Sequence, residues 1–145
     1  MVSRVVFSSK WDSWPTPDAL YESLDAEFGF VFDLAASSIN NRHANYYSAE
    51  DDSLAQDWTA IRGAKFLNPP YGRKIGAWVK KASESGGVVC LLPSRTDVRW
   101  WHDYVWDAHL NQPRPGVEVR FIKGRVKFKG ASAGAPFPSV VVVFR

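Results

Sequence analysis

The stretch that decides the fold runs from residue 64 to residue 93 and reads AKFLNPPYGRKIGAWVKKASESGGVVCLLP. Its first four residues predict a strand that ends at Asn68, because the two prolines that follow cannot continue a central strand. Apolar residues then recur at helical spacing from Ile75, and the glycine pair at 86 ends that helix before a buried strand over 88–92. This order of elements predicts an α/β fold in which the loop at Asn68 lies at the carboxyl end of its strand.

A helix and a strand are predicted ahead of this stretch. Thr16-Pro17-Asp18-Ala19 is a strong helix start, with Thr16 as a hydroxyl N-cap and Pro17 at the first helical position, and Gly29 can end the helix. The apolar run 30–36 contains Asp33 and closes on small residues, which is the profile of a buried parallel strand that opens into a loop. Residues 45–48 are a possible further strand.

The C-terminal third continues the alternation of helices and strands. Asp97 can cap a helix that runs through Leu110. Alternating apolar residues over 117–121 and 126–128 predict a hairpin around Lys123-Gly124-Arg125, and residues 139–144 predict a final buried strand. The whole pattern predicts one α/β domain over residues 1–145, with a mostly parallel sheet, a terminal antiparallel hairpin and an irregular arm up to about residue 14.

The size and composition of the chain exclude several classes of protein. Its 145 residues, 46% of them hydrophobic, fit one compact domain. The longest apolar runs, 88–92 and 140–144, are far too short to cross a bilayer, so we expect no membrane partner. The absence of a leader pattern predicts a cytoplasmic protein. One cysteine, Cys90, and three scattered histidines give no disulfide framework and no metal-ligand spacing.

Charge is distributed unevenly along the chain. Residues 1–70 contain five Lys or Arg and ten Asp or Glu, a net charge of −5, whereas residues 71–145 contain thirteen and five, a net charge of +8. Basic charge gathered in one part of a domain favours a surface for a polyanion. Chance clustering of surface charge is the alternative.

The tetrapeptide Asn68-Pro69-Pro70-Tyr71 carries the functional argument, because open α/β sheets bind ligands outside the carboxyl ends of their strands. The Asn68 side-chain oxygen and the Pro69 carbonyl can each accept one hydrogen of an aromatic amine, which would localise the nitrogen lone pair. Both proline rings stiffen the loop and carry no competing N–H group. Tyr71 offers a ring on which an extruded base can stack. A rigid Pro-Pro turn capped by an ordinary aromatic is the alternative.

With these residues in view, the chain resembles the class I S-adenosylmethionine-dependent methyltransferases, and within them the small phage-type DNA N6-adenine methyltransferases, the Dam-like family. The resemblance rests on WPTPDAL from residue 14, FDLAA from residue 32, the NPPY motif, and LLPSRTD from residue 91. It implies a Rossmann-like methyltransferase sheet, S-adenosyl-L-methionine as the cofactor, DNA as the partner, and a bacterial or phage-infected host cell. Only 35 positions separate Asp33 from Asn68, so we expect a sheet abbreviated at one edge and no separate target-recognition domain.

The resemblance also indicates which residues bind the cofactor. The predicted set is Trp14, Thr16, Pro17, Asp33, Ala35, Asp51, Asp52, Ser53 and Asn68. Small residues after Asp33 let a cofactor approach the backbone, while the Asp33 carboxylate could accept hydrogen bonds from the cofactor's methionine end or from water, or could cap the following turn. Asp51 lies near the offset of a ribose-binding carboxylate, Glu50 and Asp52 compete for that role, and a solvated acidic turn is the alternative.

The predicted catalytic residues are Asn68, Pro69, Pro70 and Tyr71, and the predicted substrate contacts are Tyr71, Arg73, Lys74, Arg95 and Phe128. Phe128 could equally be a core residue of the hairpin. Other basic residues are expected to bind DNA phosphates, namely Arg99, Lys123, Arg125, Lys127 and Lys129. The predicted activity is methylation of the N6 amine of adenine in DNA, by base flipping and direct displacement without a metal. The alternatives are methylation of cytosine N4, of RNA or of a protein glutamine amide, and a catalytically inactive nucleic-acid-binding module.

Overall fold

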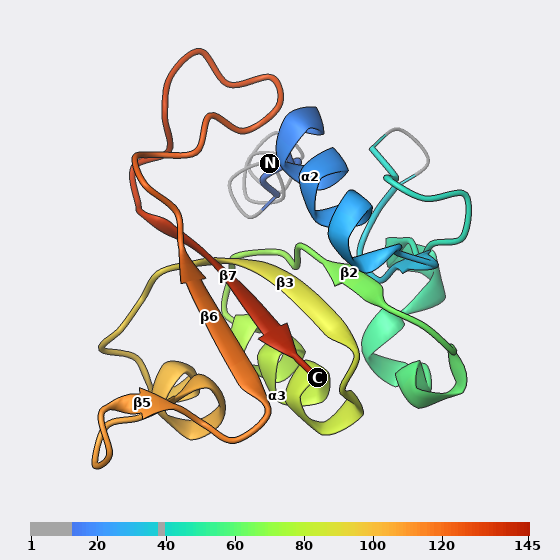
Figure 1. Cartoon of the computed structure of the whole chain (residues 1–145). Coiled ribbons are helices and arrows are strands. Elements are labelled where there is room, and N and C mark those ends of the chain that lie inside the picture. Colours follow the sequence, from blue (N-terminus) through green and yellow to red (C-terminus); the bar gives the residue numbers. More distant parts are fainter. Residues whose placement is uncertain (1–12, 38–39) are drawn as a thin grey trace.

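The computed structural model describes residues 13–37 and 40–145 (Figure 1), so most of the predicted N-terminal arm lies outside the described residues. In chain order the elements are α2 (Asp18–Phe28), β1 (Phe32–Asp33), the 3-10 helices η1 (Ala49–Asp51), η2 (Ser53–Ala55) and η3 (Trp58–Ala60), β2 (Lys65–Leu67), α3 (Ile75–Ser85), β3 (Val88–Pro93), the π-helical η4 (Trp101–Val105), β4 (Trp106–Asp107), β5 (Gln112–Pro113), β6 (Val117–Phe121) and β7 (Ser139–Phe144). Among the described residues no helix is long and apolar enough to cross a membrane.

Within residues 13–37 and 40–145, five strands form one sheet in the order β1-β2-β3-β7-β6. The pairs β1–β2 and β2–β3 are parallel, whereas β3–β7 and β7–β6 are antiparallel, so four of the five strands run in the same direction. The predicted α/β class and mostly parallel sheet are confirmed. Strands β4 and β5 form a separate antiparallel ladder.

The core lies on both faces of the two central strands. Every residue of β3 and β7 is buried, which explains why both strands are continuous apolar runs in the sequence. Helix α3 lies behind the sheet in Figure 1 and buries Val79 and Ala82. Helix α2 contributes Tyr21, whose ring meets the ring of Phe66 edge-on at 5.1 Å between centroids.

The predicted ends of both long helices are confirmed, but the predicted N-cap of α2 is wrong. Gly29 and Gly86 follow the helices with positive φ and donate to the carbonyls of Asp25 and Ala82. At the start of α2, Pro17 occupies the N-cap position and makes no side-chain cap. The hydroxyl of Thr16 does not cap the helix, because it is engaged by Asn68, 52 residues later in the chain.

The first strand is shorter than predicted, because the Asp33 side chain turns the chain away from the sheet. Its carboxylate accepts hydrogen bonds from the backbone N–H groups of Ala35 and Arg42. The possible strand at 45–48 is reduced to one parallel bridge between Asp33 and Tyr46. The described residues between β1 and β2 otherwise form 3-10 helices and loops, so among these residues β1 is the last strand of the sheet on this side.

The predicted helix over 97–110 is wrong beyond Val105. The carboxylate of Asp107 accepts from the backbone N–H groups of His109 and Leu110 at 3.0 and 3.1 Å, which competes with helical hydrogen bonding. Asn111 then takes a left-handed conformation with φ of 53°. The chain therefore forms the short β4–β5 hairpin, which projects at the lower left of Figure 1.

The hairpin predicted over 117–128 is also wrong, because β6 pairs with β7 and residues 126–128 join no strand. Phe128 is nevertheless buried, and the N–H of Lys129 donates to the carbonyl of Pro15 at 2.9 Å. The alternating apolar residues at 126–128 therefore reflect packing against the N-terminal segment and not pairing in a sheet. The loop 122–138 projects at the upper left of Figure 1.

Candidate active site

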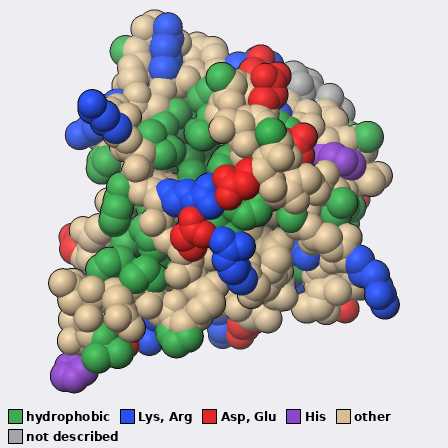
Figure 2. All heavy atoms as spheres, viewed as in Figure 1, with side chains coloured by type: hydrophobic (Ala, Val, Ile, Leu, Met, Phe, Trp, Pro, Cys, Tyr) green, Lys and Arg blue, Asp and Glu red, His purple; other side chains and the backbone are tan. Residues whose placement is uncertain are grey.

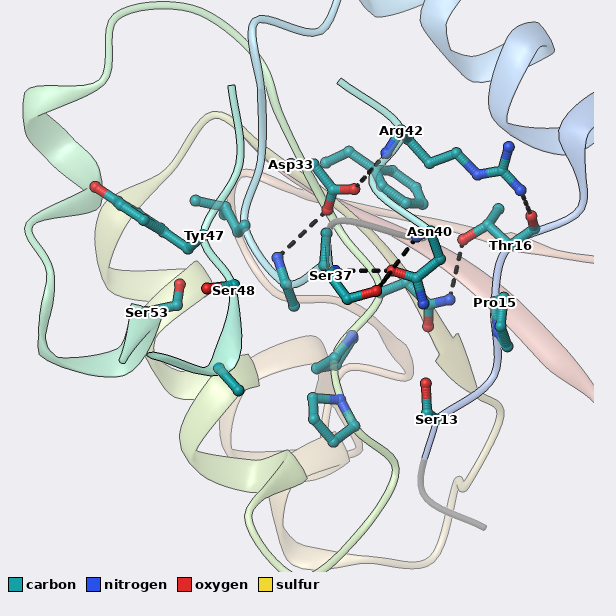
Figure 3. Close-up of a pocket in the computed structure, with 18 of the residues that line it drawn as sticks. Ser13, Pro15, Thr16, Asp33, Ser37, Asn40, Arg42, Tyr47, Ser48 and Ser53 are labelled. Atoms are coloured by element: carbon teal, nitrogen blue, oxygen red, sulfur yellow. Dashed lines mark hydrogen bonds between the residues drawn. The ribbon is translucent and has the colours of Figure 1, made fainter. Parts of the chain in front are cut away.

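A cavity of about 320 Å³ opens at the carboxyl ends of β1 and β2 (Figure 3). We call one part of its wall the acceptor end, formed by residues 13–16 and 68–70. The loop end is formed by residues 33–37, Asn40, Arg42, residues 47–49, residues 52–53, Phe66 and Trp78. The cavity is thus built where the sheet topology brings the ends of two neighbouring parallel strands together.

The acceptor end is organised around the side-chain amide of Asn68. The Asn68 Nδ2 group donates to the Trp14 carbonyl at 2.5 Å and to Thr16 Oγ1 at 2.9 Å. Asn68 Oδ1 is buried and has no hydrogen-bond partner among the described residues. A buried acceptor left without a donor costs free energy, so this atom is prepared for a donor that a ligand would supply.

The two prolines of the motif fix this corner of the cavity. Both rings line the cavity, with Pro69 buried and Pro70 exposed. Proline restricts its own φ and disfavours helical conformation in the residue before it, so Asn68 is held in an extended loop at the end of β2. The position of the amide is therefore set by the backbone before any ligand binds.

The loop end is organised around Asp33, which is 2% exposed. Burial raises the pKa of its carboxyl to about 6, against the lowering effect of the hydrogen bonds from the Arg42 and Ala35 backbones. Those two bonds, at 3.0 and 3.3 Å, hold the loop after β1 in a tight path. Asp33 therefore caps the turn that follows it, and it also lines the cavity.

Short-range polar contacts shape the rest of the loop end. Asn40 Oδ1 accepts from the N–H and the hydroxyl of Ser37 at 2.8 and 2.9 Å (Figure 3). The Asp51 carboxylate accepts from the N–H and hydroxyl of Ser48, so it serves the capping box of η1 and does not line the cavity. Asp52 and Ser53 do line it.

Arg42 connects the two ends of the cavity. Its guanidinium donates to the carbonyl of Thr16 and to the carboxylate of Asp18, and its own N–H donates to Asp33. Figure 3 shows the Arg42 side chain reaching from the loop after β1 toward Thr16. The N-terminal segment is therefore tied to both walls of the site.

The structure brings most of the predicted site residues together. Those that line the cavity are Trp14, Thr16, Asp33, Ala35, Asp52, Ser53, Asn68, Pro69 and Pro70. Those that do not line it are Pro17, Asp51, Tyr71, Arg73, Lys74, Arg95 and Phe128. Of the three carboxylates weighed for the cofactor ribose, only Asp52 reaches the wall.

Tyr71 and Phe128 belong to an aromatic cluster with Trp14 and Phe137. The Tyr71 ring is 9% exposed, its hydroxyl donates to the Leu91 carbonyl at 2.8 Å, and burial raises its pKa well above the ordinary value. Tyr71 meets Phe137 and Phe128 edge-on, with centroids 5.6 and 6.3 Å apart. The ring of Trp14 packs on both phenylalanines and also lines the cavity, so the cluster lies directly behind the acceptor end.

Sequence reasoning missed several residues of the wall. Arg42 is the only Lys or Arg between Lys10 and Arg62, and this isolation in an acidic half was the available signal. Trp78 falls in the apolar stripe of α3, whose spacing predicts core residues, but it is half-buried and lines the cavity. Asn40, Tyr47 and Ser48 carried no signal, because their segment has no periodic pattern.

Comparison with known proteins places the chain among the methyltransferases. A family model described as "DNA N-6-adenine-methyltransferase (Dam)" matches residues 4–145, and the chain belongs to this family. It is also similar to a protein of Escherichia coli (strain K12) named "Putative methyltransferase YfdM". The two are 45% identical over 65 residues, which cover 41% of this chain and 71% of the relative.

Proposed function

We propose that the chain transfers the methyl group of S-adenosyl-L-methionine to the exocyclic N6 amine of adenine in DNA. The observation that carries the proposal is the Asn68 side chain, which lines the cavity and whose buried Oδ1 has no donor among the described residues. An aromatic amine is a donor of matching chemistry. Membership of the DNA N-6-adenine-methyltransferase (Dam) family supports adenine as the base that carries this amine.

At the acceptor end, Asn68 and Pro69 act on the amine. Asn68 Oδ1 and the Pro69 carbonyl would each accept one of its two hydrogens, which favours a tetrahedral nitrogen whose lone pair points at the incoming methyl carbon. The nitrogen would attack as the neutral amine. As its bond to the methyl carbon forms, the bond from that carbon to the cofactor sulfur would break and leave a neutral thioether, and the methylated amine would then release one proton to solvent. No base strong enough to deprotonate the amine beforehand is needed.

The loop end fits the cofactor. The cavity volume lies within the range of small-molecule sites, and the small side chains Ala35, Ala36 and Ser37 let a ligand approach the backbone. When bound, S-adenosyl-L-methionine supplies a methyl group on a sulfonium, which is a strong electrophile. Asp52 lines the cavity, which supports a role in accepting hydrogen bonds from ribose hydroxyls. Asp33 holds the loop against which the methionine portion would lie.

A basic surface at the same edge of the sheet supports DNA as the substrate. Strands β2, β3 and β6 run in one direction, so the loops at their carboxyl ends share the edge at which the cavity opens. These loops carry Arg73, Lys74, Arg95, Arg99, Lys123, Arg125, Lys127 and Lys129. Lys and Arg side chains gather on the projecting loop at the upper left of Figure 2. We infer that DNA phosphates bind here.

The target adenine must leave its helix to reach Asn68, because the corner lies within a cavity. The aromatic cluster behind the acceptor end would lie close to a base that is flipped toward Asn68. Of its four rings, Trp14 is the one that lines the cavity in this structure. Stacking by Tyr71 or Phe128 requires their rings to become accessible when DNA binds.

The experiment that tests the proposal is incubation of the chain with defined DNA and methyl-labelled S-adenosyl-L-methionine, followed by nucleoside analysis. We expect label in N6-methyladenine. Label in N4-methylcytosine, in RNA or in protein glutamine under matched conditions would replace adenine by that acceptor. Binding of labelled cofactor without any transfer would favour the inactive nucleic-acid-binding module.

A further inference from the structure

We propose that Thr16 is a positioning residue for methyl transfer, because Thr16 Oγ1 and the Trp14 carbonyl together set the orientation of the Asn68 side-chain amide. This inference rests on the proposed function, since it explains how Asn68 Oδ1 comes to be available in the cavity. The two acceptors lie 52 and 54 residues before Asn68 in the chain, in the segment that leads into α2.

The orientation of this amide matters, because its two ends have almost the same shape and opposite chemistry. An amine substrate needs the oxygen, which accepts, and would be repelled by the NH₂ group, which only donates. A backbone carbonyl also only accepts. The end of Asn68 that lies 2.5 Å from the Trp14 carbonyl must therefore be the NH₂ group, which leaves Oδ1 for the substrate.

Thr16 supplies the second acceptor for the same NH₂ group. Its Oγ1 lies 2.9 Å from Asn68 Nδ2, and the residue is 4% exposed, so water does not compete freely for this bond. With both Nδ2 hydrogens engaged, a half-turn of the amide would set Oδ1 against the Trp14 carbonyl and leave two acceptors facing each other. The pair of bonds therefore holds one orientation of the amide.

The segment that presents these acceptors is itself fixed by three independent contacts. The Arg42 guanidinium donates to the Thr16 carbonyl, and the Lys129 N–H donates to the Pro15 carbonyl at 2.9 Å. The Trp14 ring packs on Phe128 and Phe137 with centroids 5.4 and 5.2 Å apart. Thr16 is thus held in register with Asn68, and the proposed positioning role acts through that residue.

The test compares Thr16→Val, which keeps the shape and removes the acceptor, with Thr16→Ser, which keeps the acceptor. Single-turnover transfer at saturating cofactor should fall about 10- to 100-fold in Thr16→Val and stay within about twofold of the native rate in Thr16→Ser. The dissociation constant for S-adenosyl-L-methionine is measured on both variants, so that cofactor saturation is verified and a loss of cofactor binding is separated from a loss in the transfer step. A native single-turnover rate in Thr16→Val would overturn the inference, whether or not cofactor binding weakens.

A second readout needs neither cofactor nor turnover, so it separates failure of this inference from failure of the proposed function. In a ¹⁵N-labelled chain, the side-chain NH₂ signals of Asn68 are identified by their absence in Asn68→Ala. Because both hydrogens are bonded and the residue is half-buried, they should exchange with solvent far more slowly than those of the exposed Asn111. Exchange as fast as that of Asn111 in the native chain would overturn the inference even if Thr16→Val failed to fold.

Discussion

The two ends of the cavity are built from contacts of different range. At the acceptor end, the Asn68 amide is held by partners more than 50 residues away, and two prolines stiffen its backbone. At the loop end, the polar contacts of Asp33, Ser37 and Ser48 join residues within ten positions of one another. The acceptor end therefore presents a single fixed atom, whereas the loop end forms a wall of the cavity. Substitutions at the acceptor end should therefore alter the chemical step, and those at the loop end should alter binding and stability.

The largest effect is expected from Asn68→Ala, because it removes the acceptor on which the proposed chemistry depends. Methyl transfer should fall by at least about 100- to 1,000-fold, with cofactor affinity within about twofold of native. Radiolabel transfer and equilibrium cofactor binding measure the two quantities.

The matched control is Asn40→Ala at the loop end, which deletes the same side chain from the wall of the same cavity. Asn40 supports Ser37, so this variant should weaken cofactor binding and transfer methyl at a near-native rate once cofactor is saturating. Retained turnover in Asn68→Ala would remove Asn68 from the mechanism. If both variants change the transfer rate and the cofactor affinity in the same way, the two ends of the cavity do not differ in function.

Asp33→Asn should change the pH dependence of stability. Burial raises the pKa of the folded carboxyl to about 6 from the ordinary 3.8, so the folded state binds the proton more tightly than the unfolded state. The stabilisation that comes from this tighter proton binding is fully present below about pH 4. It is lost as the pH rises through 6, and the loss amounts to about 3 kcal/mol. The stability of the native chain relative to Asp33→Asn should fall by that amount between pH 4 and pH 7 in denaturant titrations. A stability difference between the two proteins that does not vary with pH would contradict the raised pKa of Asp33.

Tyr71→Phe should act on stability rather than on the chemical step. It removes the buried hydrogen bond to the Leu91 carbonyl and keeps the ring, so the free energy of unfolding should drop by about 1–2 kcal/mol. The rate of methyl transfer at saturating substrate should stay close to native. A large loss of transfer with unchanged stability would show that the hydroxyl reaches the substrate when DNA binds.

The smallest effect is expected from single cations on the basic surface. Arg73→Ala should weaken DNA binding a few-fold and reduce the slope of log affinity against log salt by about one. Arg62 is an exposed arginine that precedes β2, so it lies toward the opposite edge of the sheet, and Arg62→Ala is the control that should leave the slope unchanged. If the slope of log affinity against log salt is the same in both variants, the basic surface does not bind DNA phosphates.

The stretch from 64 to 93 was predictable because local rules fix each of its boundaries. A proline pair after Leu67 stops β2, and Gly86 allows the left-handed turn that ends α3. The later part of the chain was less predictable. The Asp107 side chain ended a helical pattern, and Phe128 was buried by Trp14 rather than by a strand partner. Apolar periodicity predicts that a side chain is buried, but it does not predict which segment the side chain packs against.

The α/β class, the position of the NPPY loop at a strand end and the polar atoms of that loop follow from the amino-acid sequence alone, because covalent geometry and short-range hydrogen bonding dictate these features. Only the tertiary structure decided that Tyr71 faces the core, that Asp52 rather than Asp51 reaches the cavity, and that Trp14 and Thr16 bond Asn68. These outcomes depend on contacts between segments far apart in the chain, and such contacts form only once the sheet has brought the segments together.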